Sequence, residues 1–94
     1  MEFEWDKFKA AANLKKHGVT FDEASTVFDD PLARIFDDPE HSADENREII
    51  VGHSILGHIL LVCFTEREAD VIRVFSARPA TRKERQDYEE NASS

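Results

Sequence analysis

The chain has 94 residues, 40% hydrophobic and 34% charged, and this composition predicts one small domain at residues 1–90 with a frayed tail at 91–94. Its 20 acidic residues outnumber the 12 lysines and arginines, giving a formal net charge of −8. This balance disfavours a general nucleic-acid binder with a broad basic face, because phosphate affinity comes mainly from Lys and Arg. A single cysteine, Cys63, excludes an internal disulfide. No apolar run approaches the ~18 residues of a membrane-spanning helix, so we expect a cytoplasmic protein without membrane contact.

The charge is unevenly distributed along the chain. Residues 22–48 contain ten acids and two arginines, whereas residues 71–88 contain five basic residues and two acids. The acidic stretch is interpreted as a solvated face, and a docking face for a basic partner is the alternative. The basic stretch leaves room for a small pocket that binds one or two phosphates.

The first part of the chain predicts a strand and two helices. Residues 3–5 alternate as a short strand does, and Asp6 is an N-cap candidate for a helix that Gly18 ends. On that helix Trp5, Phe8 and Ala12 share one side, and Lys9, Asn13, Lys16 and His17 share another. A capping box, Thr20-x-x-Glu23, predicts a second, shorter helix that Asp30-Pro31 closes.

The rest of the chain predicts four strands and a last helix. The expected elements are a strand at 32–36, a turn at 37–39, a polar loop at 40–46, a strand at 47–55 interrupted at Gly52, a hairpin turn at Gly57, a strand at 59–65, a turn at 66–70, a strand at 71–78, and a helix from the capping box Thr81-x-x-Glu84 to Tyr88. Residues 59–64 are apolar on both sides, which is typical of a central strand covered on both faces. Short connections predict an α+β fold: a small antiparallel meander sheet with two N-terminal helices and a C-terminal helix.

Two arginines lie on the last predicted strand among residues of core type. Arg73 and Arg78 are five positions apart, which places them on opposite faces unless a bulge intervenes. A buried arginine requires an acidic partner or a cleft, so an ion pair is one reading and an anion site the other. Arg78 leads to the start of the last helix, where Arg82 and free backbone N–H groups favour an anion.

The remaining candidates are a tyrosine and several histidines. Tyr88 can contact Arg85 on the last helix, although a lone tyrosine is more often core or rim. Lys16 and His17 end the first helix, where cations complement the helix dipole. His53 and His58 flank the Gly57 turn, but without a third ligand they make a weak zinc site, and we expect no metal or cofactor.

The sequence resembles the BrnT-type toxins over nearly its whole length. The matching motifs are FxWDxxKxxxNxxKHGVxFxxA at 3–24, FDDP at 28–31, ExR at 45–47, Gly52, TER at 65–67, IRxxSAR at 72–78 and ATxxERxxY at 80–88. The resemblance implies a RelE-like fold and a type II toxin–antitoxin ribonuclease that cleaves RNA, inhibits translation and arrests growth. It also implies a BrnA-like ribbon-helix-helix antitoxin as partner, with DNA bound only indirectly through that antitoxin.

Two positions depart from the family pattern. His58 follows the hairpin glycine where the family often has a basic residue, and Pro79 replaces the usual Lys or Arg. Both changes weaken the cationic surface. They keep open an alternative function, a catalytically weak toxin fold that mainly binds its antitoxin and regulates the operon.

Metal-independent RNA cleavage requires a base, an acid and charge to stabilise the phosphorane. On this reading the catalytic candidates are His17, Arg78, Tyr88 and Lys16, and the candidates for RNA and phosphate binding are Arg47, Arg73, Arg82 and Arg85. The arrangement requires the end of the first helix to approach the end of the last strand.

Overall fold

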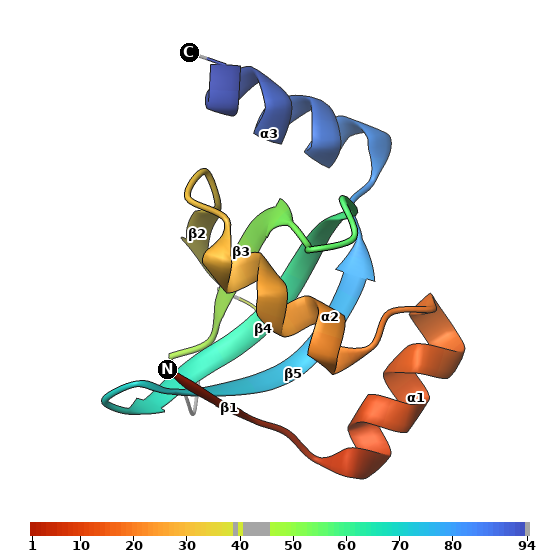
Figure 1. Ribbon diagram of the computed structural model, residues 1–94, viewed down its shortest axis with the longest axis vertical. Coiled ribbons are helices and arrows are strands. Elements are labelled where there is room, and N and C mark those ends of the chain that lie inside the picture. The colour runs from red at the N-terminus through yellow and green to blue at the C-terminus, as the bar shows by residue number, and fades with distance from the viewer. Residues whose placement is uncertain (39, 41–45, 94) are drawn as a thin grey trace.

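The computed structural model describes residues 1–38, 40 and 46–93, which form a five-stranded sheet and three α-helices (Figure 1). In chain order the elements are β1 (Glu2–Glu4), α1 (Lys7–His17), α2 (Phe21–Thr26), the 3-10 turn η1 (Val27–Asp29), β2 (Arg34–Asp37), β3 (Glu48–His53), β4 (Ile59–Glu68), β5 (Val71–Pro79) and α3 (Arg82–Ser93). The predicted α+β class, with two helices before the meander and one after it, is confirmed.

The strands lie in the order β1-β5-β4-β3-β2. From β2 to β5 each strand pairs antiparallel with the next, so the predicted meander is confirmed, and β1 adds a short parallel edge against β5. The predicted turn at 66–70 is too long, because β4 continues to Glu68, and α3 continues beyond Tyr88 to Ser93. Residues 41–45 of the predicted loop, Pro39 of the predicted turn and the terminal Ser94 lie outside the described residues.

The predicted start and end of α1 and the predicted start of α2 are confirmed, whereas α2 ends at Thr26 and not at Asp30-Pro31, because the 3-10 turn η1 follows it. The Asp6 carboxylate accepts a hydrogen bond from the Phe8 N–H at 2.8 Å and begins α1. Gly18 ends α1 in the left-handed conformation, with φ at 71°, and its N–H donates to the carbonyl of Leu14. The Thr20 hydroxyl accepts from the Glu23 N–H at 3.0 Å and begins α2. The Glu23 side chain of the predicted capping box binds Ser54 and His58 instead.

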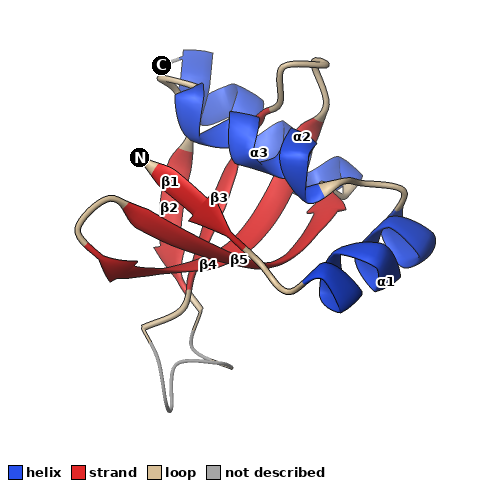
Figure 2. Ribbon diagram, turned by 60° about the horizontal axis from the view of Figure 1, so that its bottom comes forward, coloured by secondary structure: helices blue, strands red, loops and turns tan. Residues whose placement is uncertain are grey.

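Helices pack on both faces of the sheet, with α2 against one face and α3 against the other, and α1 lies beside β5 (Figure 2). The larger core lies between α2 with its flanking residues and one sheet face, and consists of Val19, Phe21, Ala24, Val27, Ile50, Leu60, Val62, Phe64, Ile72, Val74 and Ala77. On the other face, α3 contributes Tyr88 against Val51 and Leu61. The alternation of Leu60 and Leu61 between the two cores confirms β4 as a central strand covered on both sides. Among the described residues, no helix combines the length and the apolar character needed to cross a membrane.

The buried side of α1 is polar at its centre, which the helical spacing did not indicate. Phe8 is 74% exposed, whereas Asn13 is only 7% exposed. Beyond Arg73, β1 no longer pairs with β5, and the Asn13 amide pairs with Ala77 as a neighbouring strand would. The amide donates to the Ala77 carbonyl at 2.8 Å and accepts from the Ala77 N–H at 3.1 Å. This side chain therefore completes the free edge of β5 and fixes the end of α1 beside it.

Candidate functional site

The end of α1, the turn between β3 and β4, and the start of α3 surround a cavity of about 340 Å³. It is lined by His17, Gly18, Val19, Gly57, His58, Ile59, Leu60, Pro79, Ala80 and Arg85. Three of these side chains, His17, His58 and Arg85, are ionisable, and each comes from a different segment of the chain. The end of α1 thus approaches the end of β5, as the sequence interpretation requires.

His17 reaches the cavity because α1 is anchored one turn earlier. The Asn13 amide that binds Ala77 also donates to the carbonyl of Val19, at 3.0 Å, on the far side of Gly18. These bonds tie the last turn of α1 and the chain beyond it to β5. Lys16 is exposed, does not line the cavity, and has no ion pair with any described residue.

His58 is held in place from α2. The Glu23 carboxylate is 10% exposed, and its Oε2 accepts from the Ser54 hydroxyl at 2.7 Å and from His58 Nδ1 at 2.8 Å. Thr26 Oγ1 accepts from the Ile55 N–H at 2.8 Å. The turn that carries His58 is therefore fastened to α2 by three hydrogen bonds.

At the start of α3, Glu84 belongs both to the predicted capping box and to an ion pair with Arg78. Glu84 Oε1 accepts from the Thr81 N–H at 2.8 Å, and the Arg78 guanidinium donates to both Glu84 oxygens at 2.8 and 2.9 Å. Hydrogen bonds from Arg78 lower the pKa of Glu84 to about 2, and the same bonds raise the pKa of Arg78. Arg78 thus has the acidic partner that one reading of the sequence anticipated, and it does not line the cavity of His17.

The arginines of α3 differ in their surroundings. Arg85 lines the cavity, and its Nε lies 3.8 Å from Glu89 Oε1 in an exposed pair. Such a pair contributes little and is easily exchanged for another anion. Arg82 is exposed, and no described residue forms an ion pair with it.

The other two predicted phosphate-binding residues lie away from this cavity. Cys63 pairs with Ser76 and Phe64 pairs with Val74, so Phe75 is an extra residue in β5. This bulge turns Arg73 to the same sheet face as Arg78. Arg73 Nη1 lies 3.5 Å from Glu4 Oε2, and the Arg47 guanidinium lies 3.9 Å above the ring of Phe75.

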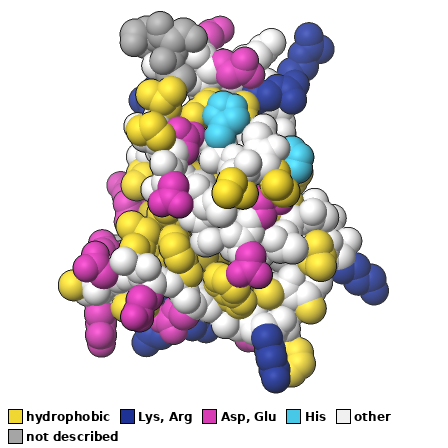
Figure 3. Space-filling model, in the orientation of Figure 1, with side chains coloured by type: hydrophobic (Ala, Val, Ile, Leu, Met, Phe, Trp, Pro, Cys, Tyr) yellow, Lys and Arg dark blue, Asp and Glu magenta, His cyan; other side chains and the backbone are white. Residues whose placement is uncertain are grey.

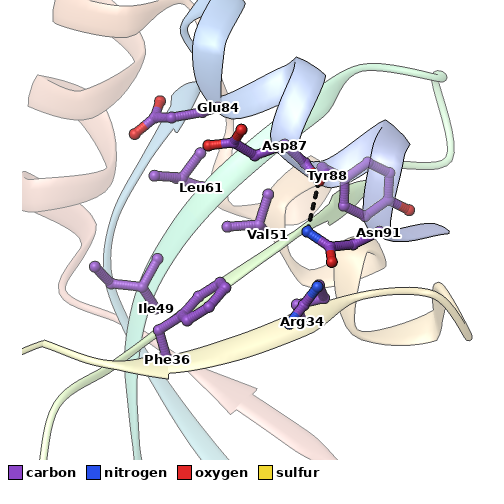
Figure 4. A pocket seen from close by; sticks show the side chains of 9 residues that line it. All are labelled: Arg34, Phe36, Ile49, Val51, Leu61, Glu84, Asp87, Tyr88 and Asn91. Atoms are coloured by element: carbon purple, nitrogen blue, oxygen red, sulfur yellow. Dashed lines mark hydrogen bonds between the residues drawn. The ribbon is translucent and has the colours of Figure 1, made fainter. Parts of the chain in front are cut away.

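Tyr88 does not line the cavity of His17. It is 3% exposed and lines a separate apolar groove of about 250 Å³ between α3 and strands β2–β4 (Figure 4). Its hydroxyl donates to Asp30 Oδ2 at 2.5 Å, and burial, followed by this bond, raises the pKa of Tyr88 to about 12. Burial also acts to raise the pKa of Asp30, but hydrogen bonds from Tyr88 and from the N–H groups of His53 and Leu32 outweigh it and lower that pKa. The structure therefore does not bring Tyr88 together with His17.

Sequence reasoning missed His58 as a partner of His17, because it considered this residue only with His53 as a zinc ligand. His53 and His58 do not share a site, because they contact different carboxylates. His58 contacts Glu23, and His53 Nδ1 lies 3.8 Å from Asp30 Oδ2. Within the described residues, no group of three or more His, Cys, Asp or Glu side chains could hold a metal ion. The one sequence feature that pointed to His58 was its place after the hairpin glycine, where the sequence analysis expects a basic residue.

Acidic side chains are prominent on one face of the molecule (Figure 3). Figure 3 shows Asp and Glu side chains spread over one face of the molecule, with Lys and Arg at its margins. On the face drawn in Figure 3, the described residues form no broad basic surface, so contact with nucleic acid through this face would depend on a small number of cations.

Comparison with known proteins assigns the chain to a family. A family profile described as "Ribonuclease toxin, BrnT, of type II toxin-antitoxin system" matches residues 5–84. The crystal structure of the Brucella abortus ribonuclease toxin BrnT has the same fold, with a TM-score of 0.69 and 26% sequence identity over 87% of this chain and 99% of that one. Among curated proteins, none matches the sequence. The chain therefore belongs to the BrnT family of ribonuclease toxins of type II toxin–antitoxin systems.

Proposed function

We propose that the chain is an endoribonuclease that cleaves RNA in the cavity between α1, the β3–β4 turn and α3. One observation carries this proposal: His17 and Arg85, from opposite ends of the chain, line the same cavity. An imidazole supplies proton transfer near neutral pH, and a guanidinium matches the oxygens of a phosphate. His17 thus supplies one group for proton transfer and Arg85 the charge that stabilises the phosphorane, two of the requirements of RNA cleavage without a metal.

The reaction begins at the ribose 2′-OH beside the scissile phosphate. A base removes the hydroxyl proton as the 2′-oxygen bonds to phosphorus, and the bond from phosphorus to the 5′-oxygen breaks as an acid protonates that oxygen. The products are a 2′,3′-cyclic phosphate and a 5′-hydroxyl. His17 serves in one of the proton transfers, and Arg85 binds the phosphorane oxygens. Lys16, exposed beside His17, adds positive charge at the rim of the cavity.

The other predicted residues take supporting roles. Arg78 holds Glu84 and so fixes the start of α3, from which Arg85 extends. Tyr88 packs α3 against the sheet through its bond to Asp30. Arg82 is proposed to bind a phosphate beside the scissile one, and Arg73 and Arg47, which lie away from the cavity, phosphates farther along the RNA.

A type II toxin implies an antitoxin partner. We propose that the partner is a BrnA-like ribbon-helix-helix antitoxin that binds this chain tightly. The antitoxin contacts DNA directly, and this chain is bound to DNA only through the antitoxin. Without the antitoxin, cytoplasmic RNA cleavage inhibits translation and arrests growth. The acidic residues of the middle of the chain provide a docking face for basic segments of that partner.

A second candidate function is antitoxin binding without appreciable catalysis. Two observations favour it: the net charge of −8, and the Glu84 carboxylate that occupies the Arg78 guanidinium. In that case the fold is retained for complex formation and control of the operon.

Incubation of the purified protein with RNA in EDTA separates the two candidates. The proposed enzyme fragments the RNA and leaves 2′,3′-cyclic phosphate ends. Arg85→Ala reduces the rate by about 100-fold, because removing one group that stabilises the charge of a transition state typically lowers kcat by about 10²–10³-fold. Lys83→Ala, which removes an exposed cation from the same helix outside the cavity, is the matched control and keeps the rate within about twofold. Intact RNA with a folded protein that still binds its antitoxin supports the second candidate instead.

A further inference from the structure

We propose that His58 is the second proton-transfer group of this cavity, so that His17 and His58 act on RNA as an acid–base pair. The inference rests on the proposed ribonuclease function and adds a catalytic residue to it. Its starting observation is that two imidazoles from separate segments, the end of α1 and the β3–β4 turn, line one cavity together with a guanidinium.

The contacts of His58 suit proton transfer. Glu23 Oε2 lies 2.8 Å from His58 Nδ1, and because a carboxylate only accepts, the proton of the neutral ring lies on Nδ1. Nε2 is then the nitrogen left to accept or donate a proton. The His58 side chain is 62% exposed, so a substrate can reach it, while the carboxylate that holds it is 10% exposed. The buried carboxylate therefore orients the ring through Nδ1, while Nε2 stays accessible to a substrate.

The ionisable groups around His58 come from three elements. Glu23 of α2 contacts the ring directly, and His17 of α1 and Arg85 of α3 share the cavity. Glu23 is a positioning residue, because its carboxylate holds the Nδ1 side of the ring. Arg85 supplies the charge for a phosphate, which leaves both imidazoles for proton transfer.

The division of labour keeps atoms and protons balanced. One imidazole, in its neutral form, takes the proton from the 2′-OH as the 2′-oxygen bonds to phosphorus. The other, in its protonated form, gives a proton to the 5′-oxygen as the bond from phosphorus to that oxygen breaks. Both rings then exchange protons with water to return to their starting forms. Activity therefore requires one ring of each form, and the rate passes through a maximum with pH.

His53 provides the contrast on the same hairpin. Its Nδ1 lies 3.1 Å from the Tyr88 hydroxyl, and its N–H donates to Asp30 Oδ2 at 2.8 Å. It does not line the cavity of His17. His53→Ala therefore removes an imidazole from the protein without touching the proposed pair.

The test compares His58→Ala, His58→Arg and Glu23→Gln with the wild type and with His53→Ala, using an RNA dinucleotide across a range of pH. The wild type gives a bell-shaped profile of kcat/KM. His58→Ala lowers the maximum by about 100-fold or more, as expected for loss of an acid or base, and flattens one limb of the bell. His58→Arg keeps a cation at this position yet shows the same loss, because arginine does not exchange its proton near neutral pH. Glu23→Gln lowers kcat with little change in KM, because the His58 ring loses the carboxylate that orients it while Arg85 still binds the phosphate. His53→Ala keeps the wild-type profile.

A second substrate assigns the direction of the proton transfers. A ribonucleotide 3′-(4-nitrophenyl phosphate) has a leaving group that departs without protonation, so it restores the rate of a variant that lacks the acid and not of one that lacks the base. Recovery of either His17→Ala or His58→Ala on this substrate, but not both, supports the pair. Wild-type rates for His58→Arg, or loss confined to His17→Ala, overturn the role of His58 while the ribonuclease function stands. An inactive wild type that is folded overturns the proposed function itself, and thermal unfolding of each variant establishes that it is folded.

Discussion

Asn13→Ala is expected to be one of the most destabilising substitutions in the chain. The Asn13 amide makes three hydrogen bonds, two with the backbone of Ala77 and one with the carbonyl of Val19. Alanine leaves the N–H and C=O of Ala77 without partners at the free edge of β5. The Val19 carbonyl also loses its donor. An unsatisfied buried group costs about 1–3 kcal/mol, so these three groups together reduce the free energy of unfolding by roughly 3 kcal/mol, after allowing for water that reaches the edge.

That loss is large for a domain of this length. At about 0.05–0.15 kcal/mol per residue, a chain of 94 residues is stable by roughly 5–14 kcal/mol. A loss of about 3 kcal/mol lowers Tm by roughly 12–24 °C, since each 1 kcal/mol shifts the Tm of such a domain by about 4–8 °C. Urea unfolding and calorimetry measure both quantities directly.

Asn91→Ala provides the matched control. The Asn91 amide also donates to a backbone carbonyl, that of Asp87, but the side chain is exposed on α3. Its replacement is expected to change the free energy of unfolding by no more than about 0.5 kcal/mol. If Asn13→Ala costs less than about 1 kcal/mol, the Asn13 amide does not serve as the missing neighbour of β5, and the reasoning about α1 is refuted.

Three further predictions concern the other buried contacts. Gly52→Ala is expected to lower the free energy of unfolding by about 1–3 kcal/mol, because a Cβ at Gly52 would lie 2.9 Å from Asp30 Oδ2 and 2.9 Å from Ala33 Cβ. An unchanged midpoint of urea unfolding would show that the segment with Asp30 and Ala33 moves aside without cost. The lowered pKa of Glu84, about 2 against an ordinary 4.5, means that its bond to Arg78 adds stability above pH ~4.5 that disappears as the pH falls towards 2. Because the Arg78 and Glu84 side chains are 41% and 32% exposed, solvent screens the pair and the gain is roughly 1–2 kcal/mol. Glu84→Gln should remove that part of the acid dependence. Tyr88→Phe should cost about 1–2 kcal/mol by removing the donor to Asp30, while RNA cleavage stays within about twofold; a much larger loss of activity would return Tyr88 to the catalytic machinery.

The parts of the fold that could be predicted from sequence depend on neighbouring residues. The caps at Asp6 and Thr20, the helix end at Gly18 and the capping box at Thr81 each require only three or four positions to interact. The doubly apolar run of β4 likewise indicates its central place without knowledge of its partners.

The parts that could not be predicted depend on register between distant segments. Nothing near Asn13 in the sequence shows that β1 is too short to cover β5, so the polar residue appeared to belong to the exposed side of α1. The bulge at Phe75 depends on how β5 pairs with β4, and it decides which face Arg73 occupies. For the site, the approach of α1 to the end of β5 was a requirement of the proposed mechanism and not a feature that the sequence pattern indicated. The bond between Glu23 and His58 likewise depends on how α2 packs against the hairpin.

The most direct test of the proposed site is expression of the wild type and of His17→Ala in cells without the antitoxin, with growth and total RNA followed together. Our account predicts that the wild type arrests growth and fragments RNA, and that His17→Ala, folded to the same level, does neither. Growth arrest with RNA fragmentation by a folded His17→Ala would contradict the placement of the ribonuclease site in this cavity.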